Sequence, residues 1–119
     1  MDIDFFKNIN DQMGHAGGDT ALIAFAHALR THFPHDIIGR LGGEEFALLS
    51  QTTEQELARR LDIFRKLCSR LNYLPNAPLL SFSAGIANLG DQALGPALHL
   101  ADQRLYQAKR SGRGMTLSQ

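Results

Sequence analysis

The sequence predicts a single α/β domain in which helices pack on one sheet. Its 119 residues suffice for one hydrophobic core but not for two. Apolar periodicity gives the order strand, helix, hairpin, helix, strand, helix, without an internal repeat, a low-complexity tract or a linker. Such an order suits one sheet covered by helices.

The first third of the chain predicts a strand, a polar loop and a helix. Residues 1–6 alternate apolar and acidic side chains, which places Asp2 and Asp4 on one face of a strand. Residues 8–18 are rich in Asn, Asp and Gly and predict a functional loop with at most a short helical turn. Residues 20–32 have the apolar spacing of an amphipathic helix. Because the strand pattern starts without a cap or turn, we expect that Met1 is an internal residue of a longer protein.

The rest of the chain predicts a hairpin, two helices and a central strand. Two short apolar runs, residues 37–41 and 46–50, flank the Gly42-Gly43 pair typical of a tight turn. Thr53 and Glu56 form a capping-box pattern before the longest helix. Residues 79–87 predict a strand in which Gly85 marks a close approach of another element, and a last helix begins near residue 94 and ends near residue 112.

The composition excludes several classes of function. Lys and Arg balance Asp and Glu at 12 each, so no net charge recruits nucleic acid or an anionic membrane. No apolar run approaches the roughly 18 residues of a membrane span. The single cysteine, Cys68, excludes an intramolecular disulfide and a cysteine-based zinc site. We expect a cytoplasmic domain, whether or not its parent protein is anchored in a membrane.

Four polar clusters are candidates for chemistry. They are an acidic strand end, a polar loop, an acidic hairpin tip and a basic helix end: Asp2 and Asp4; Lys7, Asn10, Asp11, His15 and Asp19; Glu44 and Glu45; Lys109, Arg110 and Arg113. Each cluster alone has an ordinary explanation, such as solvated acids, a polar turn or cations that complement a helix dipole.

Together, the clusters offer ligands for both metal and phosphate. Asp2 on one strand beside Glu44 or Glu45 on a neighbouring strand would suit a hard divalent cation. Lys109 and Arg113, spaced one helical turn apart, could neutralise a triphosphate. A carboxylate such as Asp19 can accept both edge donors of guanine, although the same residue could instead cap a helix that starts near Thr20.

At this point the chain resembles the GGDEF domains of diguanylate cyclases. The resemblance rests on ordered motifs across nearly the whole chain: Asp2-Ile3-Asp4-Phe5-Phe6-Lys7-Asn8-Ile9-Asn10-Asp11, Gly14-His15-Ala16-Gly17-Gly18-Asp19, Arg40-Leu41-Gly42-Gly43-Glu44-Glu45-Phe46, and Ala101-Asp102 through Lys109 to Gly112-Arg113. It implies a fold similar to nucleotidyl-cyclase and polymerase palm domains. The sheet would be mostly antiparallel and flanked by helices, with the GGEEF motif on a β-hairpin.

The resemblance also implies a set of site residues. Glu44 and Glu45 would be catalytic, and with Asp2 and the carbonyl of Ile3 they would hold two Mg²⁺ (or Mn²⁺) ions. The remaining implied contacts are to substrate: Phe5, Phe6 and Lys7 around the phosphates, Asn10 and Asp19 on guanine, Gly42 and Gly43 leaving room for the nucleotide, and Lys109 and Arg113 on the terminal phosphates.

The implied reaction joins two GTP molecules into cyclic di-GMP, with release of pyrophosphate. Because one domain would hold one GTP, a homodimer is implied, controlled by an attached sensor or regulatory domain upstream. Relatives commonly begin roughly fifty residues earlier, as a family-level expectation. We therefore expect residues 1–119 to be a single GGDEF domain that lacks its amino-terminal helix and most of the first strand. Such a fragment would be weakly active or inactive and prone to self-association.

One family feature is altered, and three rival interpretations remain. The inhibitory product site of many members, Arg-x-x-Asp, would keep Asp36 but has Phe33 at the arginine position, which predicts weak or absent feedback inhibition. The main rival is a non-catalytic GTP-binding or cyclic di-GMP-binding regulatory module. The others are a cyclase with altered base choice and a histidine metal site, whose candidate ligands are His27, His32 and His35.

Overall fold

The computed structural model describes residues 1–119 and contains one sheet and three helices. The elements in chain order are β1 (Asp2–Ile3), α1 (Phe6–His32), β2 (Ile37–Gly42), β3 (Glu45–Leu49), α2 (Glu54–Cys68), β4 (Phe82–Gly85), α3 (Leu94–Arg110) and β5 (Thr116–Leu117). The predicted α/β class is confirmed, as is the hairpin around Gly42 and Gly43.

The sheet has the strand order β2-β3-β1-β4-β5, so the short first strand lies at its centre. β1 is antiparallel to both of its neighbours, and β3 is antiparallel to β2. Only β4 and β5 are parallel. Because β1 lies between β3 and β4, residues from the hairpin, from β4 and from the amino terminus are brought together at one place.

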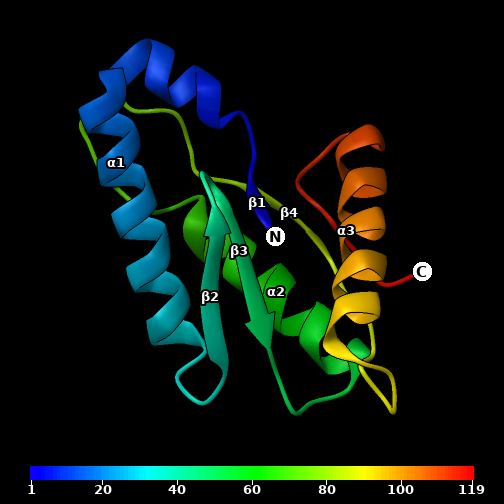
Figure 1. Ribbon diagram of the computed structural model, residues 1–119. Coiled ribbons are helices and arrows are strands. Elements are labelled where there is room, and N and C mark those ends of the chain that lie inside the picture. The colour runs from blue at the N-terminus through cyan, green and yellow to red at the C-terminus, as the bar shows by residue number, and fades with distance from the viewer.

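Helices cover both faces of this sheet (Figure 1). α1 and α2 pack on the face that carries Ile3, Phe46 and Phe82, where four phenylalanine rings meet with centroids 5.2 to 5.7 Å apart. α3 packs on the opposite face against β4. A Cβ built on Gly85 would lie 2.0 Å from a backbone oxygen of α3, which confirms the predicted close approach.

The polar stretch of residues 8–18 differs from the prediction, because it is helical. α1 begins at Phe6 and is interrupted only at Gly14, whose φ of 76° and ψ of 172° kink the helix. Ile9, Gly17 and Gly18 are buried, and most of the polar side chains between them are exposed. Two buried glycines give little apolar signal, so the amphipathic pattern is weak in the sequence.

The predicted start of α2 is confirmed, whereas the length of β4 and the presence of β5 differ from the prediction. The capping box is present, since the Thr53 hydroxyl accepts a hydrogen bond of 3.1 Å from the amide of Glu56. The central strand is shorter than predicted, and β5, at two residues, is too short to leave a periodic signal. None of the three helices combines the length and apolar character that crossing a membrane requires.

Candidate functional site

The candidate site lies where β1 meets the hairpin and the end of α3. Asp2 is paired across the sheet with Glu45 on β3 and with Ser83 on β4. Directly paired residues of antiparallel strands project from the same face, so the Asp2 and Glu45 side chains share a face. Glu44 lies beside the same strand, because its carbonyl accepts a hydrogen bond of 3.2 Å from the amide of Ile3.

Asp2 is buried and already has one cationic partner. Its side chain pairs with the Lys109 ammonium, which comes from the last turn of α3, and this contact uses the carboxylate oxygen Oδ2. The other oxygen, Oδ1, is buried without a hydrogen-bond partner. A buried acceptor without a partner is costly, so Oδ1 is a suitable ligand for a cation. No group of three or more His, Cys, Asp or Glu side chains is close enough to hold a metal by itself.

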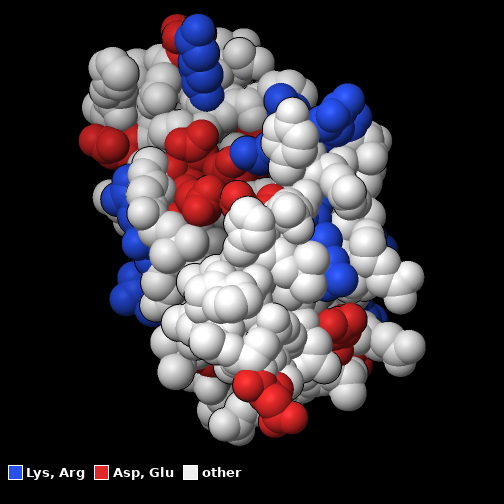
Figure 2. Space-filling model, turned by 45° about the vertical axis from the view of Figure 1, so that its right-hand side comes forward, with Lys and Arg blue, Asp and Glu red and all other residues white.

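Acidic side chains gather in one area of the surface, with basic side chains at its edge (Figure 2). The amino group of Met1 is also nearby, and it donates a hydrogen bond of 2.8 Å to the carbonyl of Phe46. Burial lowers the pKa of this amino group, and the Coulombic attraction of Glu45, Asp2 and Asp102 only partly opposes that effect. The carboxylates of Asp2 and Glu45 therefore lie close to two basic groups, the Lys109 ammonium and the Met1 amino group.

Asp4 has a structural role, which corrects the interpretation of the acidic strand end as solvated. Its Oδ1 accepts a hydrogen bond of 2.6 Å from the Ser83 hydroxyl. Its Oδ2 accepts hydrogen bonds of 3.2 Å from the Ser81 hydroxyl and of 3.0 Å from the Gly114 amide. It is 6% exposed. Asp4 thus joins β4 and the turn after α3 to the end of β1. The sequence could not reveal this, since its partners lie about 80 and 110 residues away.

The hairpin tip is held by a residue that sequence reasoning did not single out. The Arg40 guanidinium donates two hydrogen bonds, of 2.9 and 2.7 Å, to the carbonyl of Gly43. Gly43 has a φ of 23°, and a Cβ built on either Gly42 or Gly43 would meet no atom within 4 Å. The Arg40 side chain therefore fixes the tip, and the space beside Gly42 and Gly43, next to Glu44 and Glu45, is open.

The amino end of α1 follows β1 after two residues. Phe5 precedes the helix in a left-handed conformation, with φ 55°, and accepts hydrogen bonds from the amides of Asn8 and Ile9. Phe6 and Lys7 are the first helical residues, and the first amides of a helix have no partner within it. The structure thus offers amide donors beside the acidic area, as an anion requires.

The two candidates for base recognition lie on either side of the Gly14 kink. The Asn10 side-chain amide packs directly against the backbone of Gly18. A Cβ built on Gly18 would lie 1.8 Å from the Asn10 Oδ1 atom, so a larger residue at position 18 would displace Asn10. Asp19, the next residue, is exposed. The alternative interpretation of Asp19 as a helix cap is wrong, because α1 continues through residues 15–32 and does not start near Thr20.

Lys109 and Arg113 do not lie on one face of a helix, which corrects the expectation from their spacing. α3 ends at Arg110, and Arg113 lies in the following turn with a φ of 64°. Its guanidinium lies 4.9 Å from the centroid of the Phe5 ring. Arg113 therefore reaches the amino end of α1, whereas Lys109 reaches Asp2.

In the stretch that corresponds to the inhibitory site, Phe33 is part of the core, whereas Pro34 and His35 are exposed. Phe33 is 1% exposed, and the Arg60 guanidinium covers its ring at 4.8 Å. Asp36 lies 4.0 Å from the same guanidinium, and one of its oxygens has no hydrogen-bond partner.

The three histidines do not form a metal site. His32 stacks on the Phe64 ring at 5.4 Å, while His27 and His35 are exposed. No group of three or more His, Cys, Asp or Glu side chains close enough to hold a metal by themselves is found at these histidines.

A mostly antiparallel sheet flanked by helices, with acidic residues where its glycine-tipped hairpin meets the central strand, is the arrangement of a nucleotidyl-cyclase type of domain. A family model described as "Diguanylate cyclase, GGDEF domain" matches residues 1–115, and the chain belongs to this family. The resemblance inferred from the sequence motifs is thus confirmed.

Individual relatives agree with this assignment. The chain is 41% identical over 123 residues to the probable diguanylate cyclase DgcC of Escherichia coli, covering 98% of this chain and 33% of the relative. Among solved structures, it resembles the active GGEEF domain of a diguanylate cyclase from Vibrio cholerae, with a TM-score of 0.84, 32% identity, and coverage of 97% of this chain and 76% of that chain. It also resembles the diguanylate cyclase SiaD of Pseudomonas aeruginosa, solved in complex with its activator SiaC, with a TM-score of 0.87, 35% identity, and coverage of 98% and 46%.

Proposed function

We propose that this chain is the GTP-binding half-site of a diguanylate cyclase, in which two copies face each other and join two GTP molecules into cyclic di-GMP. The observation that carries the proposal is the convergence of Asp2, Glu45 and Lys109 at the end of β1, beside the glycine-tipped hairpin. Because the chain spans only about a third of the relative DgcC, the activity of the whole protein is part of the proposal.

The oxygen ligands at this position fit Mg²⁺ or Mn²⁺. The free Oδ1 of Asp2 needs a cationic or donor partner, and the Ile3 carbonyl, Glu44 and Glu45 would complete the ligand set together with substrate phosphates. Two bound ions would lower the pKa of the attacking hydroxyl and stabilise the charge of the leaving group. Lys109 lies against Asp2, and we propose that it pairs with a terminal phosphate when the nucleotide is bound.

The remaining contacts follow from where the elements end. The first amides of α1, at Phe5, Phe6 and Lys7, would bind phosphate oxygens, and Arg113 lies over the Phe5 ring within the same area. The open space above Gly42 and Gly43 would admit the nucleotide.

The base would lie at the kink of α1. The Asp19 carboxylate would accept hydrogen bonds from the N1–H and N2–H donors of guanine. The Asn10 side-chain amide would make a further hydrogen bond to the same base. The carboxylate of Asp19 is exposed, which leaves it available for this role.

The reaction balances as two successive phosphoryl transfers. The 3′-hydroxyl oxygen of one GTP attacks the α-phosphorus of the other, the bond from that phosphorus to the bridging oxygen of pyrophosphate breaks, and the hydroxyl proton is released. In the second transfer, the 3′-hydroxyl oxygen of the other nucleotide attacks the α-phosphorus of the first, which releases a second pyrophosphate and closes the ring. Each half-site holds one nucleotide, so pairing of two domains controls the rate. We propose that the upstream part of the parent protein regulates this pairing.

The test is the parent protein incubated with GTP and Mg²⁺, with cyclic di-GMP and pyrophosphate quantified. Glu44→Ala and Asp2→Asn should each lower product formation by roughly a hundredfold or more, because each removes a charge at the reacting phosphates. Asp91→Ala, which changes an exposed acid outside these motifs, is the matched control. GTP binding without any product, even when the domains are forced to dimerise, would instead establish the non-catalytic regulatory module.

Feedback by product offers a second test. Residue 33 is a phenylalanine whose ring is buried under Arg60, so it offers no guanidinium to product phosphate, and we propose that feedback inhibition through this site is weak or absent. Turnover should therefore continue at product concentrations that saturate the inhibitory site of an arginine-containing relative. Tight binding of cyclic di-GMP that is lost in Asp36→Ala would contradict this.

A further inference from the structure

The Phe5 ring and the Arg113 guanidinium are in contact, although Phe5 precedes α1 and Arg113 follows α3. The guanidinium carbon lies 4.9 Å from the ring centroid, which is within the range of a cation–π contact. Phe5 is 60% exposed, so burial in the core does not account for its ring. What the ring provides at this position is a surface for the guanidinium.

Both partners of this contact have a left-handed backbone. Phe5 has a φ of 55° and a ψ of 35°, and Arg113 has a φ of 64°. Asn76 is the only other residue besides glycine with a positive φ, so two of the three such residues are the partners of this contact. Residues in this conformation are strained, and they cluster at functional sites. The shared strain therefore indicates that the fold holds both residues in place for function.

The turn that carries Arg113 is anchored through its backbone to the residue before Phe5. The amide of Gly114 donates hydrogen bonds of 3.0 Å to Oδ2 of Asp4 and of 3.2 Å to the Ser83 hydroxyl. Asp4 directly precedes Phe5, so one buried residue fixes both backbones relative to each other. The Arg113 side chain is then the part that still has to be oriented, and the Phe5 ring lies against it.

The start of α1 places amide donors next to this guanidinium. The Phe5 carbonyl accepts hydrogen bonds of 2.9 Å from the amide of Asn8 and of 3.3 Å from that of Ile9, so the amides of Phe6 and Lys7 precede the first helical hydrogen bond. A left-handed residue next to a helical one lets successive amides form a concavity that binds anions. Amides and cation therefore meet at Phe5, where they can bind one anion together.

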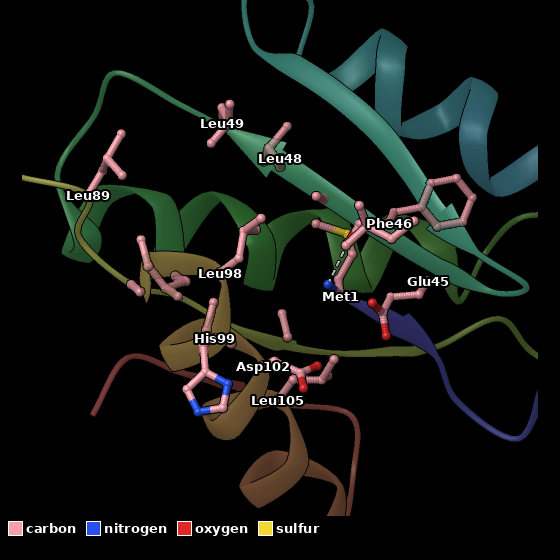
Figure 3. Close-up of a pocket in the computed structure, with 18 of the residues that line it drawn as sticks. Met1, Glu45, Phe46, Leu48, Leu49, Leu89, Leu98, His99, Asp102 and Leu105 are labelled. Atoms are coloured by element: carbon pink, nitrogen blue, oxygen red, sulfur yellow. Dashed lines mark hydrogen bonds between the residues drawn. The ribbon is translucent and has the colours of Figure 1, made fainter. Parts of the chain in front are cut away.

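The beginning of β1 differs from its end in charge. Figure 3 shows the carboxylates of Glu45, from β3, and Asp102, from α3, near Met1. The Coulombic attraction of both carboxylates raises the pKa of the Met1 amino group against the larger effect of burial, so both lie close enough to act on it. The same carboxylates would repel an anion. Phosphate oxygens are therefore better placed beyond the end of β1, toward Phe5 and Arg113, than at its start.

We propose that Phe5 is a positioning residue for Arg113, and that its ring holds the guanidinium beside the amides of Phe6 and Lys7 for the phosphate chain of GTP. The proposal rests on the proposed function, which supplies the GTP. An aromatic ring suits this task because it contacts the flat face of the guanidinium and leaves the N–H donors at the edge free for phosphate. A carboxylate partner would occupy those donors instead.

The test measures the affinity of the 119-residue chain for 3′-deoxy-GTP, which lacks the attacking hydroxyl, by calorimetry. Phe5→Leu removes the ring and should weaken binding by about threefold, the size of an exposed cation–π contact. Phe5→Tyr keeps the ring and should restore the affinity. Neither variant should lower the thermal midpoint, whereas a merely structural ring would lower it. Tyr106→Leu is the matched control, because Tyr106 is 61% exposed and contacts the Arg110 guanidinium at 5.8 Å outside this area.

A double-mutant cycle separates the role of Phe5 from an independent contact with nucleotide. Arg113→Met should weaken binding by about tenfold or more. Adding Phe5→Leu to Arg113→Met should then change the affinity by less than about 1.5-fold, because no guanidinium is left to orient. A threefold loss from Phe5→Leu in both backgrounds would overturn the proposal.

A fluorescence measurement tests the contact without nucleotide. The chain has no tryptophan, so Phe5→Trp introduces a single indole beneath Arg113. Adding Arg113→Met should raise the quenching of this indole by acrylamide, and adding Arg110→Met should not. Equal quenching with and without Arg113 would overturn the proposal.

Failure of this proposal and failure of the proposed function give different results. Cyclic di-GMP formation by the parent protein together with additive effects of Phe5→Leu and Arg113→Met would refute the role of Phe5 alone. Coupling between the two residues in nucleotide binding, without any product, would refute the cyclase and support the role of Phe5. A chain that binds no nucleotide would refute both.

Discussion

Replacing Asp4 with alanine tests whether this buried carboxylate holds the site together. The side chain accepts hydrogen bonds from the hydroxyl of Ser83 at 2.6 Å and from the amide of Gly114 at 3.0 Å, with a longer one from Ser81 at 3.2 Å. Hydrogen bonds to a charged group contribute about 1.5–3 kcal/mol each, and the two shorter ones therefore total about 3–6 kcal/mol. Part of this offsets the burial of the charge, so we expect Asp4→Ala to lower the free energy of unfolding by about 3 kcal/mol.

The measurement is urea unfolding followed by circular dichroism. With a slope of about 1.5 kcal/mol per molar urea, the midpoint should fall by about 2 M. Asp91→Ala, at an exposed position, should leave it unchanged. A double-mutant cycle with Ser83→Ala should show a coupling of about 1 kcal/mol or more. A loss below about 0.5 kcal/mol, or additive effects of the two substitutions, would refute the assignment of Asp4 as the link between the strands and the turn.

Three further predictions concern other elements. Gly85→Ala should cost about 3 kcal/mol or more in unfolding free energy, because the new Cβ would lie 2.0 Å from a backbone oxygen of α3, whereas Gly39→Ala meets open space and should change it by less than about 1 kcal/mol. Arg40→Met removes both hydrogen bonds to the Gly43 carbonyl. The loss in free energy of GTP binding, measured by calorimetry, should exceed the loss in free energy of unfolding. The reverse order would contradict the role of Arg40 at the tip. Burial raises the pKa of the Cys68 thiol from 9.0 to about 12, so the stability gained from keeping it neutral is complete below pH 9 and is lost as the pH rises toward 12. Iodoacetamide at pH 9 should modify Cys68 only in urea, and rapid modification of the folded chain would show that the thiol is not buried.

The amino-acid sequence alone determined the family, the fold class and most of the elements. The reason is that the signals are local: the glycine pair with its flanking apolar runs gives the hairpin, and Thr53 with Glu56 gives the start of α2. Gly85 also predicted a close approach, because only the absence of a side chain allows one inside a strand. The helical nature of residues 8–18 was missed, since its buried positions include two glycines that carry no apolar signal.

Only the tertiary structure decided which residues meet. Asp2 lies in β1 and Asp4 directly follows it, and the sequence pattern treated them alike. In the structure Asp4 is a buried link to Ser83 and Gly114, whereas Asp2 pairs with Glu45 across the sheet and with the Lys109 ammonium. Spacing suggested that Lys109 and Arg113 share a helix face, but the end of α3 at Arg110 sends them to different partners. Such contacts join residues up to about 110 positions apart, and they depend on strand order and register, which no local pattern encodes.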